Sequence, residues 1–406
     1  MRVTTLLNKL LNLPGLWVRG IRFENDALII VCHRRFRLLT CPECGTQVRG
    51  RFSEKRRTWR HLAIWGKSTF IEAPIRRMRC PECRKVKTEA VPWARPRARF
   101  TRPFEDVVGL LAQKLNHTSV AELTGISWVT VGAIAGRLVD ELLLEDRFDN
   151  LLAIGVDEIS YRRHHRYLTI VMDHDQERVI WAGEGKSADT LQQFFDELTD
   201  EQLESIQFVS IDMAQAYISA VEGNLPDATI VFDRFHVARL AQDRVDEVRR
   251  ALMRALDPDE RRHLKRTRWV LLKRPGRLRR SERARLETIR KANDKLYRAY
   301  LLKETLLDVY DQDDSQRARD AIDAWLSWAQ RSRLNPFVRL ARTVRKHLDG
   351  ILAFIDSRLT NARLEGMNNK IRLLSHRAYG FHSADSLIAM VYLCCAKITL
   401  PEVQLA

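Results

Sequence analysis

The feature of this sequence that most restricts its fold is a repeated cysteine motif in the N-terminal part. Cys41-Pro-Glu-Cys44 recurs as Cys80-Pro-Glu-Cys83. Two residues between thiolates allow both sulfurs to reach one ion from a tight turn, and two such turns complete a tetrahedral four-sulfur site. A redox dithiol is the alternative for a single pair, but the duplication argues against it. The four cysteines are therefore predicted to hold a structural Zn²⁺. The 35 residues between Cys44 and Cys80 should form a small β subdomain.

Positive charge is concentrated in two segments. The chain carries 69 Lys and Arg against 52 Asp and Glu, a net charge of +17. Residues 1–100 hold 23 basic and 7 acidic side chains, and residues 249–303 hold 20 and 6, so the remainder is acidic. This distribution is typical of a polyanion-binding protein whose central part has another task. Solvated helix faces are the alternative for the second segment, but they explain the first segment poorly.

Composition argues against a membrane or secreted protein. No apolar run approaches the ~20 residues that a membrane-spanning helix requires. The N-terminal stretch Met1–Leu16 is interrupted by Asn8, Lys9, Asn12 and Pro14, which does not fit a signal peptide. The seven cysteines are an odd number, and a disulfide framework is not expected. We therefore expect a cytoplasmic protein.

A helical pattern follows the cysteine region. Apolar residues at helical spacing begin at Phe104, Gly125 interrupts the second helix, and Ser127 can cap a third helix that runs to about Glu145. A short helix, a glycine-containing turn and a capped helix outline a helix-turn-helix. The Pro- and Arg-rich stretch Pro92–Pro103 before it is predicted to be an exposed linker.

The middle of the chain alternates strands and helices. Apolar runs of strand length occur at 151–156, 166–172, 179–183, 208–211 and 229–232, and helical patterns at 190–198 and 214–222. The order β-β-β-α-β-α-β is that of an RNase H-like domain. Residues 237–356 lack strand patterns and form a predicted helical block, divided by Pro258, Pro275 and Pro336.

Aspartates terminate three of these apolar runs: Asp157, Asp212 and Asp233. A carboxylate at a strand end needs a partner that offsets its desolvation, and Mg²⁺ is such a partner. Two ions held in this way can activate a nucleophile and stabilise the leaving oxygen in phosphoryl transfer. Each aspartate alone is more often a helix cap or turn residue, but the repeated placement favours a metal site.

A second polar cluster lies near the C-terminus. Asn361 is a predicted N-cap, which puts Glu365 in the first turns of a helix. Four polar or basic residues follow on that helix: Asn368, Asn369, Lys370 and Arg372. Glu365 could supply a third metal ligand while the amides and Lys370 contact phosphates. A capped surface helix is the alternative for Glu365 alone.

Together these motifs resemble the DDE transposases of bacterial insertion sequences, and are most similar to the ISL-three family. The resemblance covers nearly the whole chain. Its most specific pieces are Ile154-Gly-Val-Asp157-Glu, Val231-Phe-Asp233-Arg-Phe-His236-Val, and Asn361 to Lys370 continuing to Arg377-Ala-Tyr-Gly-Phe381.

The resemblance implies a metal-binding triad of Asp157, Asp212 and Glu365. Asp233 and His236 match an Asp-x-x-His signature of related transposases with helical insertions, and the 152 residues between Asp212 and Glu365 agree with such an insertion. Asp233 remains the alternative second aspartate. Asp212 is preferred because an RNase H-like sheet puts it beside the first strand.

The resemblance also implies a mechanism and partners. Two Mg²⁺ (or Mn²⁺) ions would support hydrolysis at the transposon ends and then strand transfer. The zinc module and the helix-turn-helix would bind double-stranded DNA at terminal inverted repeats, with Ser127–Arg137 as recognition helix and Ser127, Trp128 and Thr130 nearest the bases. Arg137 and the polar residues of the Glu365 helix would add DNA contacts. Synapsis of two ends implies a homodimer, associated with the bacterial nucleoid.

The predicted fold is a multidomain α+β and α/β protein with five segments. These are a zinc-binding basic domain (1–100), a helix-turn-helix (101–148), the first catalytic part (149–236), an all-helical insertion (237–356) and the second catalytic part (357–406). Trp325 and Trp328 in the insertion could stack on an unpaired base, but such a pair is more often core.

Two other functions remain open from the sequence. A DNA-binding regulator or an inactive transposase copy would share the basic charge, the zinc site and the helix-turn-helix, but needs no converging carboxylates. Another RNase H-like nuclease, such as a resolvase, would rarely need a separate N-terminal reader of sequence.

Overall fold

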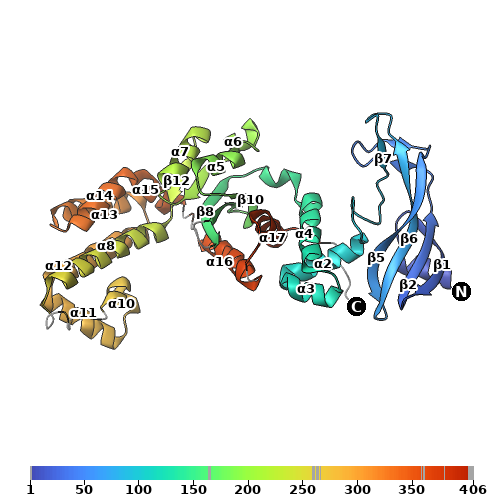
Figure 1. Ribbon diagram of the computed structural model, residues 1–406. Helices are drawn as coiled ribbons and strands as arrows, with labels where there is room; N and C mark the ends of the chain where they lie inside the picture. Colours follow the sequence, from blue (N-terminus) through green and yellow to red (C-terminus); the bar gives the residue numbers. More distant parts are fainter. Residues whose placement is uncertain are drawn as a thin grey trace. The chain divides into compact units, whose positions relative to one another are not determined.

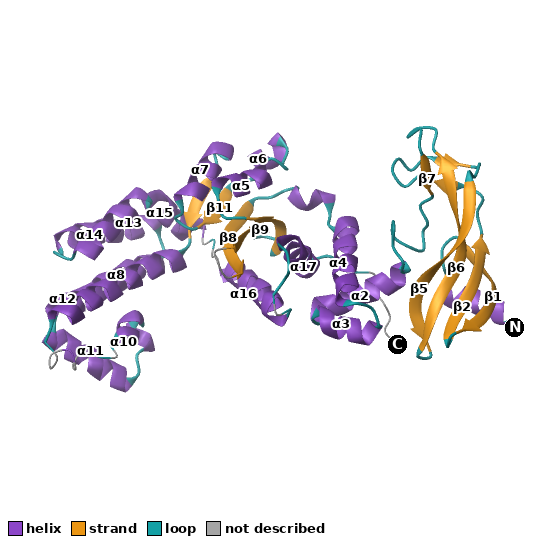
Figure 2. Cartoon of the chain, in the orientation of Figure 1, coloured by secondary structure: helices purple, strands orange, loops and turns teal. Residues whose placement is uncertain are grey.

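The computed structural model describes residues 2–162, 166–257, 261, 265, 267–357, 359, 362–378 and 380–400. Backbone contacts divide the chain into two compact units, which we describe one at a time. The first comprises residues 1–144 and those from 377 onward, and the second comprises residues 145–376. Figure 1 labels the elements, and Figure 2 shows a strand-rich N-terminal part followed by a chain in which helices predominate.

The first unit begins with a five-stranded sheet in the order β1-β2-β6-β5, with β7 paired to β6. Its strands are β1 (Leu16–Glu24), β2 (Ala27–Arg34), β5 (Ser53–Ile64), β6 (Lys67–Arg79) and β7 (Val86–Thr88). A helix, α1 (Val3–Leu11), packs on β1, and β3 (Leu39–Thr40) pairs with β4 (Gln47–Val48). Because β4, β5 and β6 lie between Cys44 and Cys80, the prediction of a β subdomain in that interval is confirmed.

Segment 92–103 is packed, so the prediction of an exposed linker is wrong. Trp93 is 1% exposed, and its ring meets that of Trp59 edge to face at 5.5 Å in the core of the sheet. Arg95 is 4% exposed and forms ion pairs with Asp106, Glu105 and Glu141. A buried guanidinium is tolerated only where carboxylates balance it, and these partners lie on helices farther along the chain.

Helices complete the first unit: α2 (Arg102–Lys114), α3 (His117–Thr124), α4 (Trp128–Leu142) and α17 (Ala384–Cys395). Ser127 caps α4 by accepting from the Thr130 N–H, as predicted, and Gly125 ends α3 at φ +64°. The sequence grouped residues 357–406 with the catalytic domain, whereas those from 377 onward fall in this unit. The reason is that apolar α17 packs on α2 and α4, with Gln113 donating to the Leu393 carbonyl.

The second unit is built on a mixed sheet in the order β10-β9-β8-β11-β12. Its strands are β8 (Ala153–Arg162), β9 (Arg166–Asp173), β10 (Arg178–Glu184), β11 (Phe208–Ile211) and β12 (Thr229–Phe232). The first three pair antiparallel, whereas β11 is parallel to both β8 and β12. Between the strands lie α5 (Ala188–Phe195), α6 (Asp200–Ser205) and α7 (Gln215–Asn224). The bounds of β11 and β12 are those predicted; α6 is additional.

A helical block follows β12 and leads back to the sheet through α16 (Ala362–Arg377). Its described α-helices are α8 (Arg234–Ala255), α10 (Arg268–Leu272), α11 (Arg280–Ala292), α12 (Asp294–Asp308), α13 (Ser315–Arg331), α14 (Asn335–Lys346) and α15 (Leu348–Ser357). The block shares one core with the sheet, since α15 packs on β12 and the Phe232 ring meets His347 at 5.0 Å. Trp325 is 1% exposed and donates to the Leu302 carbonyl, and Trp328 packs against the same core, so the core interpretation of this pair is confirmed.

Within the described residues, no single helix has the length and apolar character needed to cross a membrane. The bent pair α3 and α4 passes that test only when its two helices are joined.

Candidate functional site

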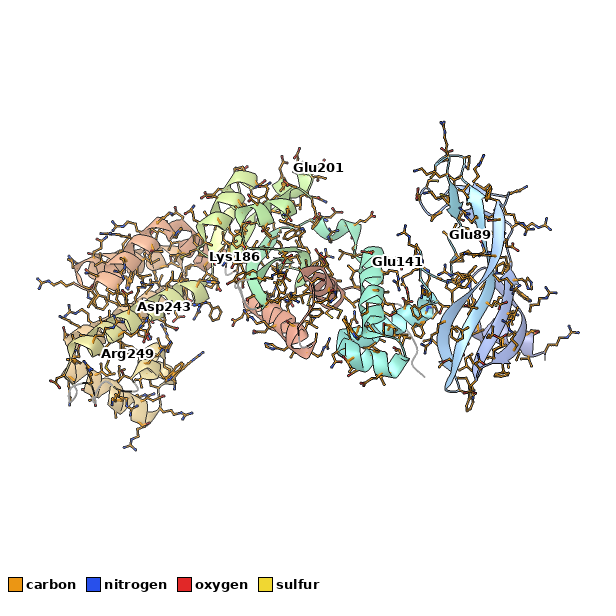
Figure 3. The ribbon with its side chains drawn as sticks, in the orientation of Figure 1. Glu89, Glu141, Lys186, Glu201, Asp243 and Arg249 are labelled. Atoms are coloured by element: carbon orange, nitrogen blue, oxygen red, sulfur yellow. The ribbon has the colours of Figure 1, made fainter. Side chains whose placement is uncertain are left out.

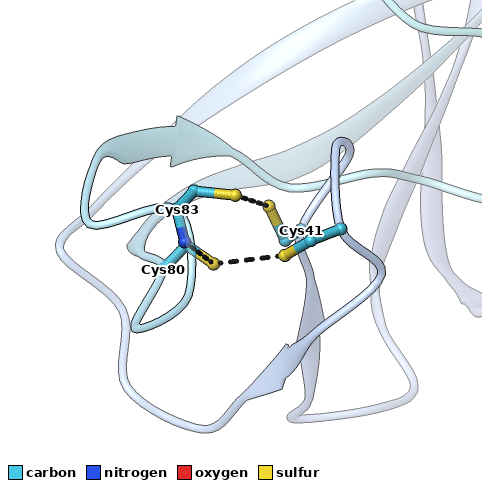
Figure 4. Close-up of side chains that lie close together, drawn as sticks. Cys41, Cys80 and Cys83 are labelled. Carbon is cyan, nitrogen blue, oxygen red and sulfur yellow. Dashed lines mark hydrogen bonds between the residues drawn. The ribbon is translucent and has the colours of Figure 1, made fainter.

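The four predicted zinc ligands meet in the first unit. Their sulfur atoms all lie within 4.8 Å of one another (Figure 4). Cys41 and Cys83 are 3.8 Å apart at Sγ, and Cys44 and Cys80 are 3.5 Å apart. A tetrahedral site with Zn–S bonds of about 2.3 Å places its sulfurs about 3.8 Å apart, so these thiols fit a structural Zn²⁺.

The local backbone shapes both cysteine turns alike. The Cys41 N–H donates to the Thr46 carbonyl at 2.9 Å, and the Cys80 N–H donates to the Lys85 carbonyl at 3.0 Å. Hydrogen bonding with Thr46 lowers the pKa of Cys44 to about 6, whereas the neighbouring Cys44 raises the pKa of Cys83 to about 12. Thiolates this close repel one another, and a divalent cation among them would relieve that repulsion.

The helix-turn-helix exposes part of its predicted recognition surface. Ser127 is exposed, Thr130 is half-buried, and Trp128 is 52% exposed at the start of α4. Arg137 lies farther along the helix and is engaged with the buried Glu105 of α2. Arg60 of β5 donates to the Gly125 carbonyl at 2.7 Å, which ties the turn to the sheet.

The three predicted aspartates, Asp157, Asp212 and Asp233, lie at one level of the sheet of the second unit. In β8 and β11, Gly155 pairs with Ser210, so extending the register by two residues puts Asp157 beside Asp212. In β11 and β12, Ile211 pairs with Phe232, so the next residues along are Asp212 and Asp233. The expectation that Asp157 ends its strand is wrong, because β8 continues to Arg162 as a hairpin with β9.

Each aspartate uses one oxygen in a local hydrogen bond. Oδ1 of Asp157 accepts from the Glu158 N–H at 2.7 Å, and Oδ1 of Asp212 accepts from the Ala214 N–H at 2.9 Å. Oδ1 of Asp233 accepts from the Phe235 N–H at 3.1 Å and caps α8. The capping interpretation is therefore correct for Asp233, and it does not exclude metal binding through the second oxygen.

Electrostatic interactions connect these aspartates to the other predicted site residues. Burial raises the pKa of Asp157, and the Asp212 carboxylate raises it further, while His236 and Asn368 oppose the rise. Burial also raises the pKa of Asp233, with contributions from Asp157 and Glu365. Both shifts arise mainly from burial, and neighbouring carboxylates add to them. Buried oxygen donors beside one another fit Mg²⁺ or Mn²⁺.

The carboxylates are less closely gathered than the thiols. Among the described residues, the four cysteines form a group whose ligand atoms all lie within 4.8 Å of one another, and the carboxylates of Asp157, Asp212 and Glu365 form no such group.

Helix α16 presents the second polar cluster in two directions. Glu365 lies in its first turn and is exposed, as are Asn369, Lys370 and Arg372. The prediction that Asn368 contacts phosphates is wrong. Its side chain is 1% exposed, and its amide donates to Oδ2 of Asp157. Asn361, the predicted cap of this helix, and Tyr379 lie outside the described residues.

Glu158 and the groups around it were not among the predicted site residues. Burial raises its pKa, with a further contribution from Asp212, while Tyr217 and Lys186 oppose the rise. Tyr217 is buried with its hydroxyl 3.0 Å from that of Thr169, and Lys186 is labelled in Figure 3. The alternation of buried and exposed residues along β8 could have indicated that Glu158 is partly buried only if the end of this strand had been predicted correctly.

Three family models match successive parts of the chain. The DDE-type ISL3 family model, described as a transposase, matches residues 154–391. The zinc finger of transposases IS204, IS1001, IS1096 and IS1165 matches residues 37–83, and the helix-turn-helix domain of transposase family ISL3 matches residues 89–139.

Curated relatives match along almost their whole length. The chain is 39% identical over 422 residues to the transposase for insertion sequence element IS1557 of Mycobacterium tuberculosis, covering 95% of this chain and 94% of that one. It is 28% identical over 386 residues to the transposase for insertion sequence element IS1001 of Bordetella parapertussis, covering 94% and 95%.

Proposed function

Since this chain belongs to the ISL3 family of insertion-sequence transposases, we propose that its catalytic residues are Asp157, Asp212 and Glu365 and that its catalysis depends on Mg²⁺. The observation that carries the proposal is the common level of Asp157 and Asp212 on adjacent parallel strands. Glu365 interacts electrostatically with Asp233 at the same level. Asp233 and His236 act as supporting residues of this site.

The sheet supports an RNase H-like catalytic domain. Three antiparallel strands are followed by two parallel ones, and α16 returns to the sheet after the helical block. We retain the five-part division at residues 100, 148, 236 and 356 as a proposal, with the last described helix, α17, supporting the helix-turn-helix.

Each proposed catalytic residue would have its own role in the reaction. Asp157 and Asp212 present carboxylate oxygens from the sheet, and Glu365 presents one from the first turn of α16. Mg²⁺ or Mn²⁺ bound there supplies nucleophile activation and stabilises the leaving oxygen of a phosphodiester. His236 interacts electrostatically with both Asp157 and Asp233 and opposes the rise of their pKa values. The reaction is hydrolysis at the element's ends followed by strand transfer.

The first unit would recognise the ends. The zinc site fixes the loops beside a strongly basic sheet, which adds salt-dependent phosphate contacts. Ser127, Trp128 and Thr130 at the start of α4 face the bases of the terminal inverted repeats. Arg137 supports this helix through Glu105. Asn369, Lys370 and Arg372 on α16 contact the backbone of double-stranded DNA near the cleaved bond.

Assembly and location follow from the reaction. Two transposon ends must be held together, so we propose a homodimer in the synaptic complex. The protein acts in the bacterial cytoplasm in association with the nucleoid.

The test is cleavage of a plasmid that carries the gene with its native flanking DNA. Wild-type protein should break the DNA at the element's boundaries in Mg²⁺ or Mn²⁺. Asp157→Asn should bind these boundaries without breaking them. Asp175→Asn replaces an exposed aspartate in the turn after β9 and should behave as wild type.

Two outcomes would contradict the proposal. Binding without cleavage by the wild-type protein would favour an inactive copy or a regulator. Equal loss of binding and cleavage in Asp157→Asn would indicate misfolding instead of a catalytic role.

A further inference from the structure

Among the described residues of α16, Asn368 is the one with a buried polar side chain, and this side chain contacts Asp157. It is 1% exposed, and its Nδ2 donates to Oδ2 of Asp157, which lies 211 positions earlier in the chain. Oδ1 of Asp157 already accepts from the Glu158 N–H. Both oxygens of this carboxylate are therefore held by donors, and its orientation is fixed.

The same helix is attached to the sheet at two further points. Arg363 donates to the His174 carbonyl at 2.9 Å. Leu364 is fully buried over Gly155, where an added Cβ would lie 3.2 Å from Leu364 Cδ2. Arg363, Leu364 and Asn368 thus anchor α16 on β8 and the turn that follows β9.

Glu365 and Asn368 are three residues apart on α16 and lie on neighbouring positions of one helical face. A bond from Asn368 to Asp157 therefore restrains the position of Glu365 relative to Asp157. We propose that Asn368 is a positioning residue of the candidate catalytic site, which sets the orientation of Asp157 and the approach of Glu365. The inference rests on the proposed function of those two carboxylates.

The chemistry of asparagine suits this position. Its amide donates to a carboxylate without adding positive charge, so it orients Asp157 without competing with a cation for the site. Its Oδ1 is buried and has no hydrogen-bond partner among the residues that the structure describes. A buried acceptor without a donor is costly, and water held on a bound ion is a donor that the protein itself does not supply.

The competing explanation is that Asn368 only holds α16 on the sheet and does not orient Asp157. The substitution Asn368→Leu distinguishes this docking role from the positioning role. Leucine keeps the volume. It removes the unpaired Oδ1, which offsets the donor that Oδ2 of Asp157 loses, so a docked helix remains stable. Asn224→Leu is the matched control, because Asn224 is a partly buried asparagine of the same unit whose side chain bonds Gln192 and the Ala220 carbonyl.

The experiment measures Mn²⁺ binding by titration calorimetry on zinc-loaded, full-length protein without DNA, together with thermal unfolding. Wild type and Asn224→Leu should bind Mn²⁺ with equal affinity, and Asp157→Asn should lose this binding. Asn368→Leu should weaken it about 10–100-fold, the usual effect of removing a group that orients a ligand. Its melting temperature should equal that of the wild type, and saturating Mn²⁺ should restore part of the cleavage rate.

Three results would contradict the inference, and they are distinguishable. Wild-type Mn²⁺ affinity in Asn368→Leu, with binding still lost in Asp157→Asn, would refute the positioning role alone. Lower thermal stability of Asn368→Leu with unchanged affinity would establish a docking role. Equal Mn²⁺ binding by wild type and Asp157→Asn would refute the proposed catalytic metal site itself.

Discussion

The guanidinium of Arg95 donates a hydrogen bond to the Asp106 carboxylate at 2.7 Å in the interior of the first unit. Burial raises the pKa of Asp106, and Arg95 opposes that rise by favouring the charged form. Arg95 also pairs with Glu105 and Glu141, the latter labelled in Figure 3. This network joins the segment before α2 to both α2 and α4, and so holds the predicted recognition helix to the zinc-binding sheet.

We expect Arg95→Met to destabilise the first unit strongly. The substitution leaves the buried carboxylates of Glu105 and Asp106 without their shared cation, and breaking a buried pair costs about 3–5 kcal/mol. Chemical denaturation of the full chain, followed by tryptophan fluorescence, measures the loss. Arg99→Ala removes an exposed arginine of the same segment and should change stability by less than about 0.5 kcal/mol. Equal effects of the two substitutions would show that the network contributes little.

Loss of one zinc ligand should reduce zinc binding and folding together. Cys41→Ser removes one of four sulfurs, and the remaining thiols no longer complete a closed tetrahedral site. Folded yield and bound zinc, measured by elemental analysis, should therefore fall together. Cys394→Ser lies outside the cluster and should retain its zinc. A Cys41→Ser protein that folds normally without zinc would show that the ion is not structural.

Several elements were accessible from sequence because their signals are local. β11 and β12 are short apolar runs buried on the sheet, and their bounds were predicted correctly. The caps of α4 and α8 follow from Ser127 and Asp233, which bond the backbone two or three residues ahead. The two-residue spacing within each cysteine pair is enough to predict that both sulfurs can reach one ion.

Other features depend on contacts between distant segments, and sequence patterns do not contain them. Arg95 is buried because carboxylates on α2 and α4 surround it. The sequence around Asn368 predicts an exposed helix residue. Its hydrogen bond to Asp157 forms only because α16 packs against β8, and the local sequence does not show that packing. The end of β8 was misplaced because the strand continues past its apolar run as a partly exposed hairpin with β9.

Gly155 should be essential for the approach of α16 to the sheet. A Cβ at this position would lie 2.7 Å from Nε2 of His174 and 3.1 Å from Oγ of Ser210, and it would also press on Leu364. Gly155→Ala should therefore cost about 1–3 kcal/mol of unfolding free energy and reduce cleavage more than DNA binding. Gly223→Ala is the control, because a Cβ there meets nothing within 4 Å. Unchanged stability and cleavage in Gly155→Ala would mean that the helix can shift at no cost.

His174 should make the stability of the second unit depend on pH. Burial and, to a lesser extent, the nearby Arg363 lower its pKa to about 4, although Asp173 opposes both. The unfolded chain takes up this proton near pH 6.5, whereas the folded chain takes it up only near pH 4. His174 therefore contributes no penalty above pH 6.5, and stability is lost as the pH falls from 6.5 to 4, by at most about 3 kcal/mol.

The His174 effect is isolated by comparing wild type with His174→Asn. Unfolding free energies measured between pH 4 and 8 should differ by a constant amount above pH 6.5. Below that pH the difference should shift in favour of the variant, which has no imidazole to protonate on unfolding. A difference that stays constant from pH 8 to pH 4 would contradict the depressed pKa.

Trp128 and Arg137 lie on the same predicted recognition helix but should affect different properties. Trp128 is 52% exposed, so Trp128→Ala should leave stability unchanged and weaken binding to the element's ends relative to unrelated DNA, by about 1–3 kcal/mol for a lost base contact. Arg137→Ala should instead lower stability, because the buried Glu105 loses a partner. Binding to both DNAs by fluorescence anisotropy, at one fixed salt concentration, separates these effects. Leu123→Ala, exposed on α3, should alter neither property. If Trp128→Ala weakens binding to both DNAs equally, the start of α4 contacts the DNA backbone and reads no bases.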